Sequence, residues 1–179
     1  MTTYVALLRG INVGGREKVA MDDLRRLFTD LGHAEVETYI QSGNVIFRSP
    51  VDDASKLAHD IESRMAADLD MAVTVLLRSE DELAQIIADN PFLDSEADQS
   101  KLHVTFLADP PSEDRANGLN TPAGEPDELV LAGLEVYLHC PNGYGRTKVN
   151  NAYIEKQLGV AATTRGWKTV AKLHTLTGG

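Results

Sequence analysis

Strand and helix patterns occur in the same order twice along this chain, and that repetition limits the folds open to it. In the first half, residues 4–9 form a short apolar run that predicts a buried strand. Apolar residues at helical spacing follow, and then residues 36–41 and 44–48 flank Ser42-Gly43, a pair typical of a tight hairpin turn. A second helical stripe and a strand at residues 72–78 complete the order strand, helix, strand, strand, helix, strand.

The same order returns after a linking helix. Ser79 and Glu82 have the spacing of a capping box, which starts this helix, and Asn90-Pro91 ends it. A short helix is predicted after Ser112, and a last helix begins near Trp167. The other elements of the second half are strands at residues 102–107, 129–132, 134–140 and 160–164 and a helix at residues 149–158.

This order is that of the split β-α-β unit of ferredoxin-like folds. We therefore predict an α+β fold of two ferredoxin-like (β-α-β-β-α-β) units with a linking helix and an extra C-terminal helix. Residues 1–78 form the first unit, and residues 79–179 comprise the linking helix, the second unit and the C-terminal helix. Such units place residues 9–16 near residues 41–44, and residues 142–148 near residues 164–167.

Charge is sorted along the chain, whose formal net charge is -10. Residues 136–179 carry six basic side chains and one acidic one, whereas residues 79–135 carry 14 acidic side chains and two basic ones. The acidic total argues against general coating of nucleic acid, which needs a basic face. The basic segment at the end of the chain leaves room for a focused contact with a small anion.

Three stretches combine glycine or turn-forming residues with arginine, at residues 9–16, 142–148 and 163–167. Exposed backbone N–H groups beside arginine hold anions in many proteins. We predict a phosphate-bearing, nucleotide-like small molecule as the ligand, while the sequence identifies no catalytic residue, cofactor or oligomeric state. The predicted ligand-binding residues, with two from the hairpin turn, are Arg9, Asn12, Gly14, Gly15, Ser42, Asn44, Arg146, Lys148, Arg165 and Trp167.

Each of these stretches also has a purely structural interpretation. Residues 10–16 nearly match a phosphate loop but lack its lysine and hydroxyl, and their glycines can simply permit a tight turn. Residues 142–148 can connect a strand to a helix, with Thr147 as the N-cap. Ser42-Gly43 is first of all a turn signal, and packing is the leading interpretation of Trp167, ahead of stacking on a ligand.

Metal binding and thiol catalysis are not indicated. Cys140 follows His139 within a predicted strand, where neighbouring side chains point to opposite faces, so the two do not form a nucleophile and its base. We predict a buried, inert thiol. The histidines lack the paired spacing of a zinc site, and they are His33, His59, His103, His139 and His174.

A cytoplasmic location is expected. No apolar run approaches the roughly 20 residues that cross a bilayer, and the N-terminus lacks a basic-then-apolar signal pattern. The single cysteine, Cys140, fits a reducing compartment.

Other classes of function stay open at this point. An enzyme acting on an anionic, phosphorylated substrate would use the same arginines to stabilise developing charge, although no base or nucleophile is evident. Ferredoxin-like sheets bind RNA when their central strands display aromatic residues, and Tyr4 and Phe47 occupy those strands here, but the RNA-recognition signature is missing. A self-associating scaffold protein is a further alternative.

Three motifs are similar to those of a known family: LLRGINVGG at residues 7–15, YIQSGNV at residues 39–45 and TRGW at residues 164–167. Together they resemble domain-of-unknown-function family 1697, small bacterial proteins of unassigned activity. The resemblance covers nearly the whole chain. It implies an α+β fold of two ferredoxin-like units and brings no established substrate or catalytic residue.

Overall fold

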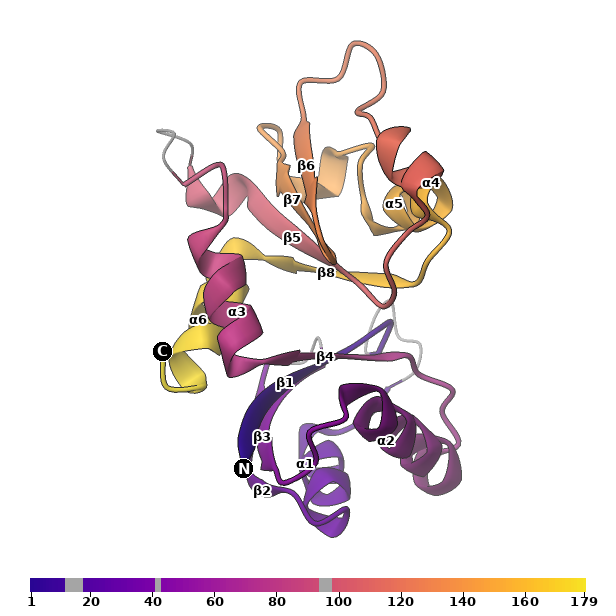
Figure 1. Cartoon of the computed structure of the whole chain (residues 1–179), viewed down its shortest axis with the longest axis vertical. Coiled ribbons are helices and arrows are strands. Elements are labelled where there is room, and N and C mark those ends of the chain that lie inside the picture. Colours follow the sequence, from indigo (N-terminus) through magenta and orange to yellow (C-terminus); the bar gives the residue numbers. More distant parts are fainter. Residues whose placement is uncertain (12–17, 41–42, 94–97) are drawn as a thin grey trace. The chain divides into compact units, whose positions relative to one another are not determined.

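A computed structural model describes residues 1–11, 18–40, 43–93 and 98–179 (Figure 1). The described residues form a mixed α+β fold with two four-stranded antiparallel sheets and six α-helices. The chain divides into two compact units, residues 1–85 with 173–179 and residues 86–172. It passes from one unit to the other within α3 (Glu80–Ala88) and again within α6 (Trp167–Leu176).

The first unit contains the first four strands and two helices, and its sheet has the order β2-β3-β1-β4. Every neighbouring pair in this sheet is antiparallel. Its elements are β1 (Thr2–Leu8), α1 (Met21–Asp30), β2 (Ala34–Tyr39), β3 (Asn44–Ser49), α2 (Ala54–Leu69) and β4 (Val75–Ser79).

Side-chain caps define where two helices begin. Asp53 precedes α2, and its carboxylate accepts a hydrogen bond from the Lys56 N–H at 3.1 Å. The capping box before α3 is confirmed, because the Ser79 N–H donates to Glu82 at 2.8 Å and the Glu82 N–H donates to the Ser79 hydroxyl at 3.2 Å. Local sequence therefore sets these two boundaries.

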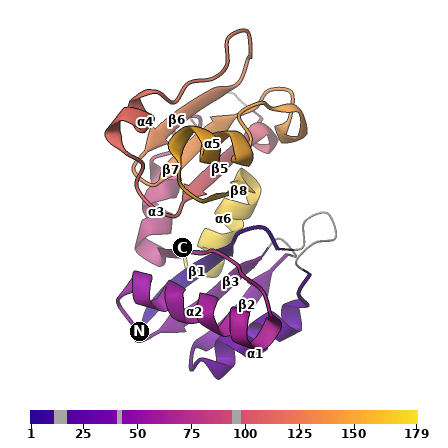
Figure 2. The ribbon, with the colours of Figure 1, turned by 90° about the vertical axis from the view of Figure 1, so that its right-hand side faces the viewer.

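The core of the first unit lies between its sheet and the helices α1 and α2, which cover the same face of that sheet (Figure 2). Tyr4 and Phe47 stack on this face with ring centroids 5.7 Å apart, and Phe28 of α1 meets Phe47 edge-on at 5.1 Å. The Tyr4 hydroxyl donates to the Val51 carbonyl at 3.0 Å. Both aromatic residues of the RNA-binding alternative are therefore buried in the core and cannot stack on bases.

His33 belongs to the same aromatic group, with its ring centroid 4.8 Å from that of Phe47. Its Nδ1 atom is buried without a hydrogen-bond partner. Burial lowers the pKa of the His33 imidazole below the ordinary value of 6.5, although the Asp60 carboxylate acts in the opposite direction. The folded unit thus favours neutral His33.

Acid is expected to destabilise the protein partly through this histidine. Because the unfolded chain takes up the proton first, the contribution of His33 to stability is complete above its ordinary pKa of 6.5 and is lost as the pH falls through the lowered pKa. His33→Phe keeps a ring beside Phe47, so it should flatten the fall in unfolding free energy below this pH. Urea titrations at several pH values give the unfolding free energy of the wild type and of His33→Phe. An equal pH dependence in the two proteins would contradict this role of His33.

The second unit repeats this arrangement, with a sheet of order β6-β7-β5-β8 that is again antiparallel throughout. Two short 3₁₀ turns, η1 and η2, accompany its strands and helices. Its elements are η1 (Gln99–Lys101), β5 (Leu102–Leu107), α4 (Glu113–Asn117), β6 (Glu128–Ala132), β7 (Glu135–His139), η2 (Tyr144–Arg146), α5 (Asn151–Leu158) and β8 (Ala162–Gly166).

The central strands of the two sheets pair in the same register. Tyr4 of β1 lies opposite Phe47 and Ser79, and His103 of β5 lies opposite Leu138 and Gly166. The ends of these pairings match as well. The Leu8 N–H at the end of β1 donates to the carbonyl of Gly43, the residue before β3, at 2.9 Å. The Leu107 N–H at the end of β5 donates to the carbonyl of Leu134, the residue before β7, at 2.8 Å. Each residue of one sheet centre therefore has a counterpart in the other.

Two differences between the structure and the prediction lie next to the loops of the second unit. Strand β8 ends at Gly166 instead of residue 164, so Arg165 lies within the strand, and α6 follows without a loop. Thr147 is not a helix N-cap. Because α5 begins at Asn151, Asn150 is its cap and accepts from the Tyr153 N–H at 2.9 Å, whereas the Thr147 hydroxyl donates to Asp127 at 2.5 Å.

In the part of the chain that the structure describes, none of the helices has the length and apolar character needed to span a membrane.

Candidate functional site

In the second unit, three segments meet at the end of the sheet where β5 begins. Strands β7 and β8 both run antiparallel to β5, so His139 and Gly166 end their strands beside Leu102 and His103. The Cys140 N–H donates to the Lys101 carbonyl at 2.9 Å and fixes the start of the following loop. The predicted proximity of residues 142–148 to residues 164–167 is confirmed at this sheet end.

Each of the three segments carries a basic residue near this sheet end. We call the set formed by Lys101, Gly143, Tyr144, Arg146 and Lys168 the basic loop cluster. The Lys101 ammonium lies beside Gly143, 3.9 Å from where a Cβ atom on that residue would be. Arg146 and Lys168 are exposed, and Lys101 is half-buried. Three cations thus come from the segments around a glycine whose φ is +90°.

Asp98 is an acidic neighbour of this cluster. The Ser100 N–H donates to its carboxylate at 2.9 Å, and this bond is the main cause of its lowered pKa, with smaller contributions from Lys101 and Lys168. The carboxylate already serves as the N-cap of η1. Its interactions show that Lys101 and Lys168 act on the same small region.

A stacked pair of rings supports the loop from the side of the sheet. His103 and Tyr144 have ring centroids 4.7 Å apart and an interplanar angle of 26°. Burial lowers the pKa of His103, so its ring packs here as a neutral imidazole. The Tyr144 hydroxyl accepts from the Asn151 N–H at 2.8 Å, which ties the loop to the start of α5.

Behind the loop lies a buried polar group formed by Asp127, Thr147 and Cys140. The Thr147 hydroxyl donates to Asp127 and accepts from the Val149 N–H at 3.1 Å. Burial raises the pKa of the Cys140 thiol, and the charge of Asp127 adds to this effect while a hydrogen bond with Thr147 opposes it. Cys140 is therefore a buried, protonated thiol and a poor nucleophile.

The other predicted residues of this half are less available to a ligand. Arg165 is 7% exposed, its Nη1 donates to the Thr163 hydroxyl at 2.6 Å and to the Thr164 carbonyl at 3.0 Å, and burial lowers its pKa to about 10. Trp167 is 4% exposed, which favours its packing role. Lys148 is exposed and forms an ion pair with Glu125 at 3.0 Å. Ligand contact by these three residues stays a prediction.

The first unit has its own loop cluster at the end of β1. The Leu8 N–H donates to the Gly43 carbonyl at 2.9 Å, so the start of the Gly/Arg-rich loop lies beside the hairpin turn, as predicted. Arg9 is exposed, and its backbone N–H donates to Thr74. Asn44 is buried, and its amide donates to the Tyr39 carbonyl at 3.0 Å, so it closes the hairpin. The predicted site residues outside the described ranges are Asn12, Gly14, Gly15 and Ser42.

The sequence prediction missed three basic residues. Lys101 and Lys168 are brought together only by the pairing of β5 with β7 and β8. Arg78 corresponds to Arg165, since they lie opposite Val5 and Val104 at matching positions, and its Nη1 likewise donates to the preceding carbonyl, at 2.9 Å. In both halves an arginine and a small residue stand directly before a helix. This pattern is the sequence signal that could have revealed the correspondence.

Among the described residues, no group of three or more His, Cys, Asp or Glu side chains is arranged to hold a metal ion.

Comparisons with known proteins identify a family but no activity. A family model described as "Protein of unknown function (DUF1697)" matches residues 1–137. The chain is similar in structure to a conserved bacterial protein, SP0830, from Streptococcus pneumoniae, with a TM-score of 0.76, 26% sequence identity and 98% of each chain covered. No protein with curated annotation matches it.

Proposed function

Since the chain belongs to the DUF1697 family of proteins of unknown function, we propose a function from its own side chains: it binds a phosphate-bearing or other anionic small ligand. The basic loop cluster of the second unit carries this proposal. Lys101, Arg146 and Lys168 supply positive charge from three segments of the chain, and Lys101 lies beside the backbone of Gly143. An anion held there would gain from each of the three cations, which outnumber the single negative charge of the neighbouring Asp98.

The start of α6 adds to the favourable field. Its first turn contains Lys168 and no acidic residue. No carboxylate in that turn therefore competes with an anion for the positive end of the helix dipole. The Tyr144 ring beside Lys101 and Gly143 suits a nucleotide-like ligand, whose flat base could lie on an aromatic surface. Arg165 and Lys148 would contribute from the border of this cluster.

The Gly/Arg-rich loop of the first unit is proposed as a second part of the binding function. It comprises Arg9 with Asn12, Gly14 and Gly15, and we include the hairpin residues Ser42 and Asn44 in this second part. The support for this part is the exposed position of Arg9 at the end of β1. The single buried cysteine also fits a cytoplasmic location, where phosphorylated small molecules are abundant.

We further propose that residues 1–78 and 79–179 contain duplicated ferredoxin-like units. The two sheets share strand order, and Tyr4 and His103 share their pairing register, which supports this proposal. Duplication would explain why Arg78 and Arg165 have the same place in their strands.

A thermal-shift screen at low salt tests the anion site, with inorganic phosphate, nucleotides and sugar phosphates as probes. A ligand at roughly 100 times its Kd stabilises by about 2.7 kcal/mol, so the wild type should melt roughly 5–10 °C higher. The double variant Lys101→Ala, Arg146→Ala should lose this rise. Lys156→Ala removes an exposed cation elsewhere in the same unit and should keep it.

Arg9→Ala tests the first-unit part by the same measurement. A rise that survives in the double variant and disappears in Arg9→Ala would move the site to the first unit. No rise with any probe in the wild type would contradict anion binding altogether.

A further inference from the structure

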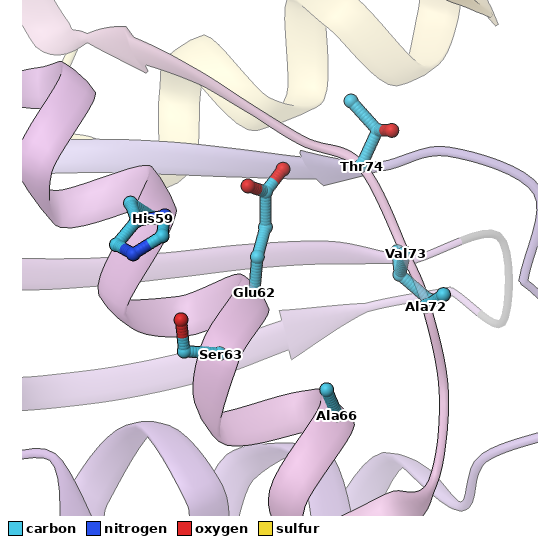
Figure 3. A pocket seen from close by; sticks show the side chains of 7 residues that line it. All are labelled: His59, Glu62, Ser63, Ala66, Ala72, Val73 and Thr74. Carbon is cyan, nitrogen blue, oxygen red and sulfur yellow. The ribbon is translucent and has the colours of Figure 1, made fainter.

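A pocket of the first unit lies between α2 and the segment that precedes β4, away from both loop clusters in sequence (Figure 3). It is a shallow groove with a volume of about 390 Å³ that is largely open to solvent, and His59, Ser63, Ala66 and Ala72 on its wall are exposed. Polar and small apolar side chains share its wall. The lining residues are His59, Glu62, Ser63, Ala66, Ala72, Val73 and Thr74.

The wall is held in place by backbone and side-chain hydrogen bonds. His59, Glu62, Ser63 and Ala66 follow one another at helical spacing on α2, so they form a single stripe on that helix. Glu62 fastens this stripe to the sheet, because one of its carboxylate oxygens accepts from the Val75 N–H at 2.8 Å. The Thr74 carbonyl accepts from the Arg9 N–H at 3.0 Å and anchors the other wall.

The lining groups are matched to a hydrogen-bond donor. In Figure 3 the Glu62 carboxylate lies between the His59 ring and Thr74. One oxygen of Glu62 is used by Val75, and the other, together with the hydroxyls of Ser63 and Thr74, can accept from a ligand. Among the described residues that line the pocket there is neither lysine nor arginine, and Glu62 brings its formal negative charge, so an anion would be repelled.

We propose that this pocket binds a small primary amine with a short aliphatic chain. An ammonium group carries three donors and a positive charge, which the Glu62 carboxylate and the neighbouring hydroxyls can satisfy. Ala66 and Val73 provide apolar contact for the methylene groups. This site is separate from the basic loop cluster of the second unit, since it has the opposite charge and uses none of the residues of that cluster, while its Thr74 lies next to Arg9 of the first-unit loop.

Amide chemical shifts of the full chain, titrated with n-butylamine at neutral pH, test the proposal. Shifts concentrated in residues 59–75 are expected in the wild type. Glu62→Gln keeps an oxygen for the Val75 N–H and removes the charge, so binding should weaken at least about tenfold. Ala66→Leu leaves Glu62 intact and places a larger side chain in the groove, so it should weaken binding comparably.

Two controls separate a site from general attraction to an acidic protein. Glu37→Gln, an exposed carboxylate on β2, makes the same change in net charge and should leave the affinity unchanged. The neutral alcohol 1-butanol should bind more weakly than the amine. Shifts spread over the acidic surface, equal binding by Glu62→Gln, or no saturation by the amine at about 50 mM would each overturn the proposal.

Discussion

Replacing Phe47 by alanine is expected to lower the free energy of unfolding by about 3–5 kcal/mol, the usual cost of removing a large buried ring. Phe47 is fully buried on β3. Its ring meets those of Tyr4, Phe28 and His33 at centroid distances of 5.7, 5.1 and 4.8 Å. Truncation would leave a cavity where the sheet, α1 and His33 come together.

Urea denaturation followed by circular dichroism measures the effect of Phe47→Ala. Phe47→Leu keeps most of the volume and should cost less, about 1 kcal/mol. Val130→Ala removes methyl groups from a strand residue that is 40% exposed and should change stability by less than about 0.5 kcal/mol. A loss for Phe47→Ala no larger than that of the Val130 control would show that this aromatic group does not hold the first unit together.

The position of Phe47 also shows a limit of the sequence prediction. Residues 4–7 of β1 are all buried, so the pattern predicts a strand with two apolar faces but does not say which face carries the helices. The RNA-binding alternative needed Tyr4 and Phe47 on the open face. The structure places them on the face that α1 and α2 cover, where they share one core with apolar residues of both helices.

Local signals succeeded where one short segment determines the geometry. The capping box at Ser79 and Glu82 and the hairpin glycine Gly43 were recognised because each needs only a few neighbouring residues. The strand predicted at residues 160–164 includes Thr163 and Thr164 but ends before Arg165, which was predicted among turn-forming residues, whereas in the structure Arg165 and Gly166 continue that strand. A strand made of polar residues lacks the alternation of apolar and polar side chains by which a strand is recognised in a sequence.

The basic loop cluster lay beyond local signals for a different reason. Lys101 follows an acidic segment in sequence and is 42 residues before Gly143, whose backbone it approaches. Only the register of β5 with β7 brings these residues together. From the fold class, the sequence predicts that residues 142–148 lie near the end of β8. It does not predict that a third segment contributes Lys101 to the same place.

Replacing Gly43 by alanine is expected to destabilise the first unit by about 2–5 kcal/mol, through two separable effects. Its φ of +85° is a conformation that costs an L-residue roughly 1–2 kcal/mol. A Cβ atom there would also lie 2.7 Å from Ile11 Cδ1 and 3.0 Å from Leu8 Cβ, and such overpacking costs about 1–3 kcal/mol. Ile11 and Leu8 are buried in the core, so they have little room to withdraw.

Gly133→Ala provides a matched control in the corresponding hairpin of the second unit. Gly133 has a φ of +62°, but a Cβ atom on it would meet no described atom within 4 Å beyond its own chain neighbours. Its substitution should therefore cost only the conformational part, about 1–2 kcal/mol. The difference between the two variants in urea denaturation isolates the clash, and equal losses would show that packing around Gly43 is not tight.

A second substitution can relieve the clash and identify its partner. Ile11→Ala alone should destabilise by about 2–5 kcal/mol, because it empties a fully buried position. Combined with Gly43→Ala, it makes space for the new methyl group, so the double variant should be more stable than the sum of the single losses predicts, with a coupling of about 1–2 kcal/mol. Additive losses would assign the cost of Gly43→Ala to backbone conformation. Coupling would instead show that the hairpin turn and the first residues after β1 are packed as one structure, which is the arrangement that places Arg9 at the end of the sheet.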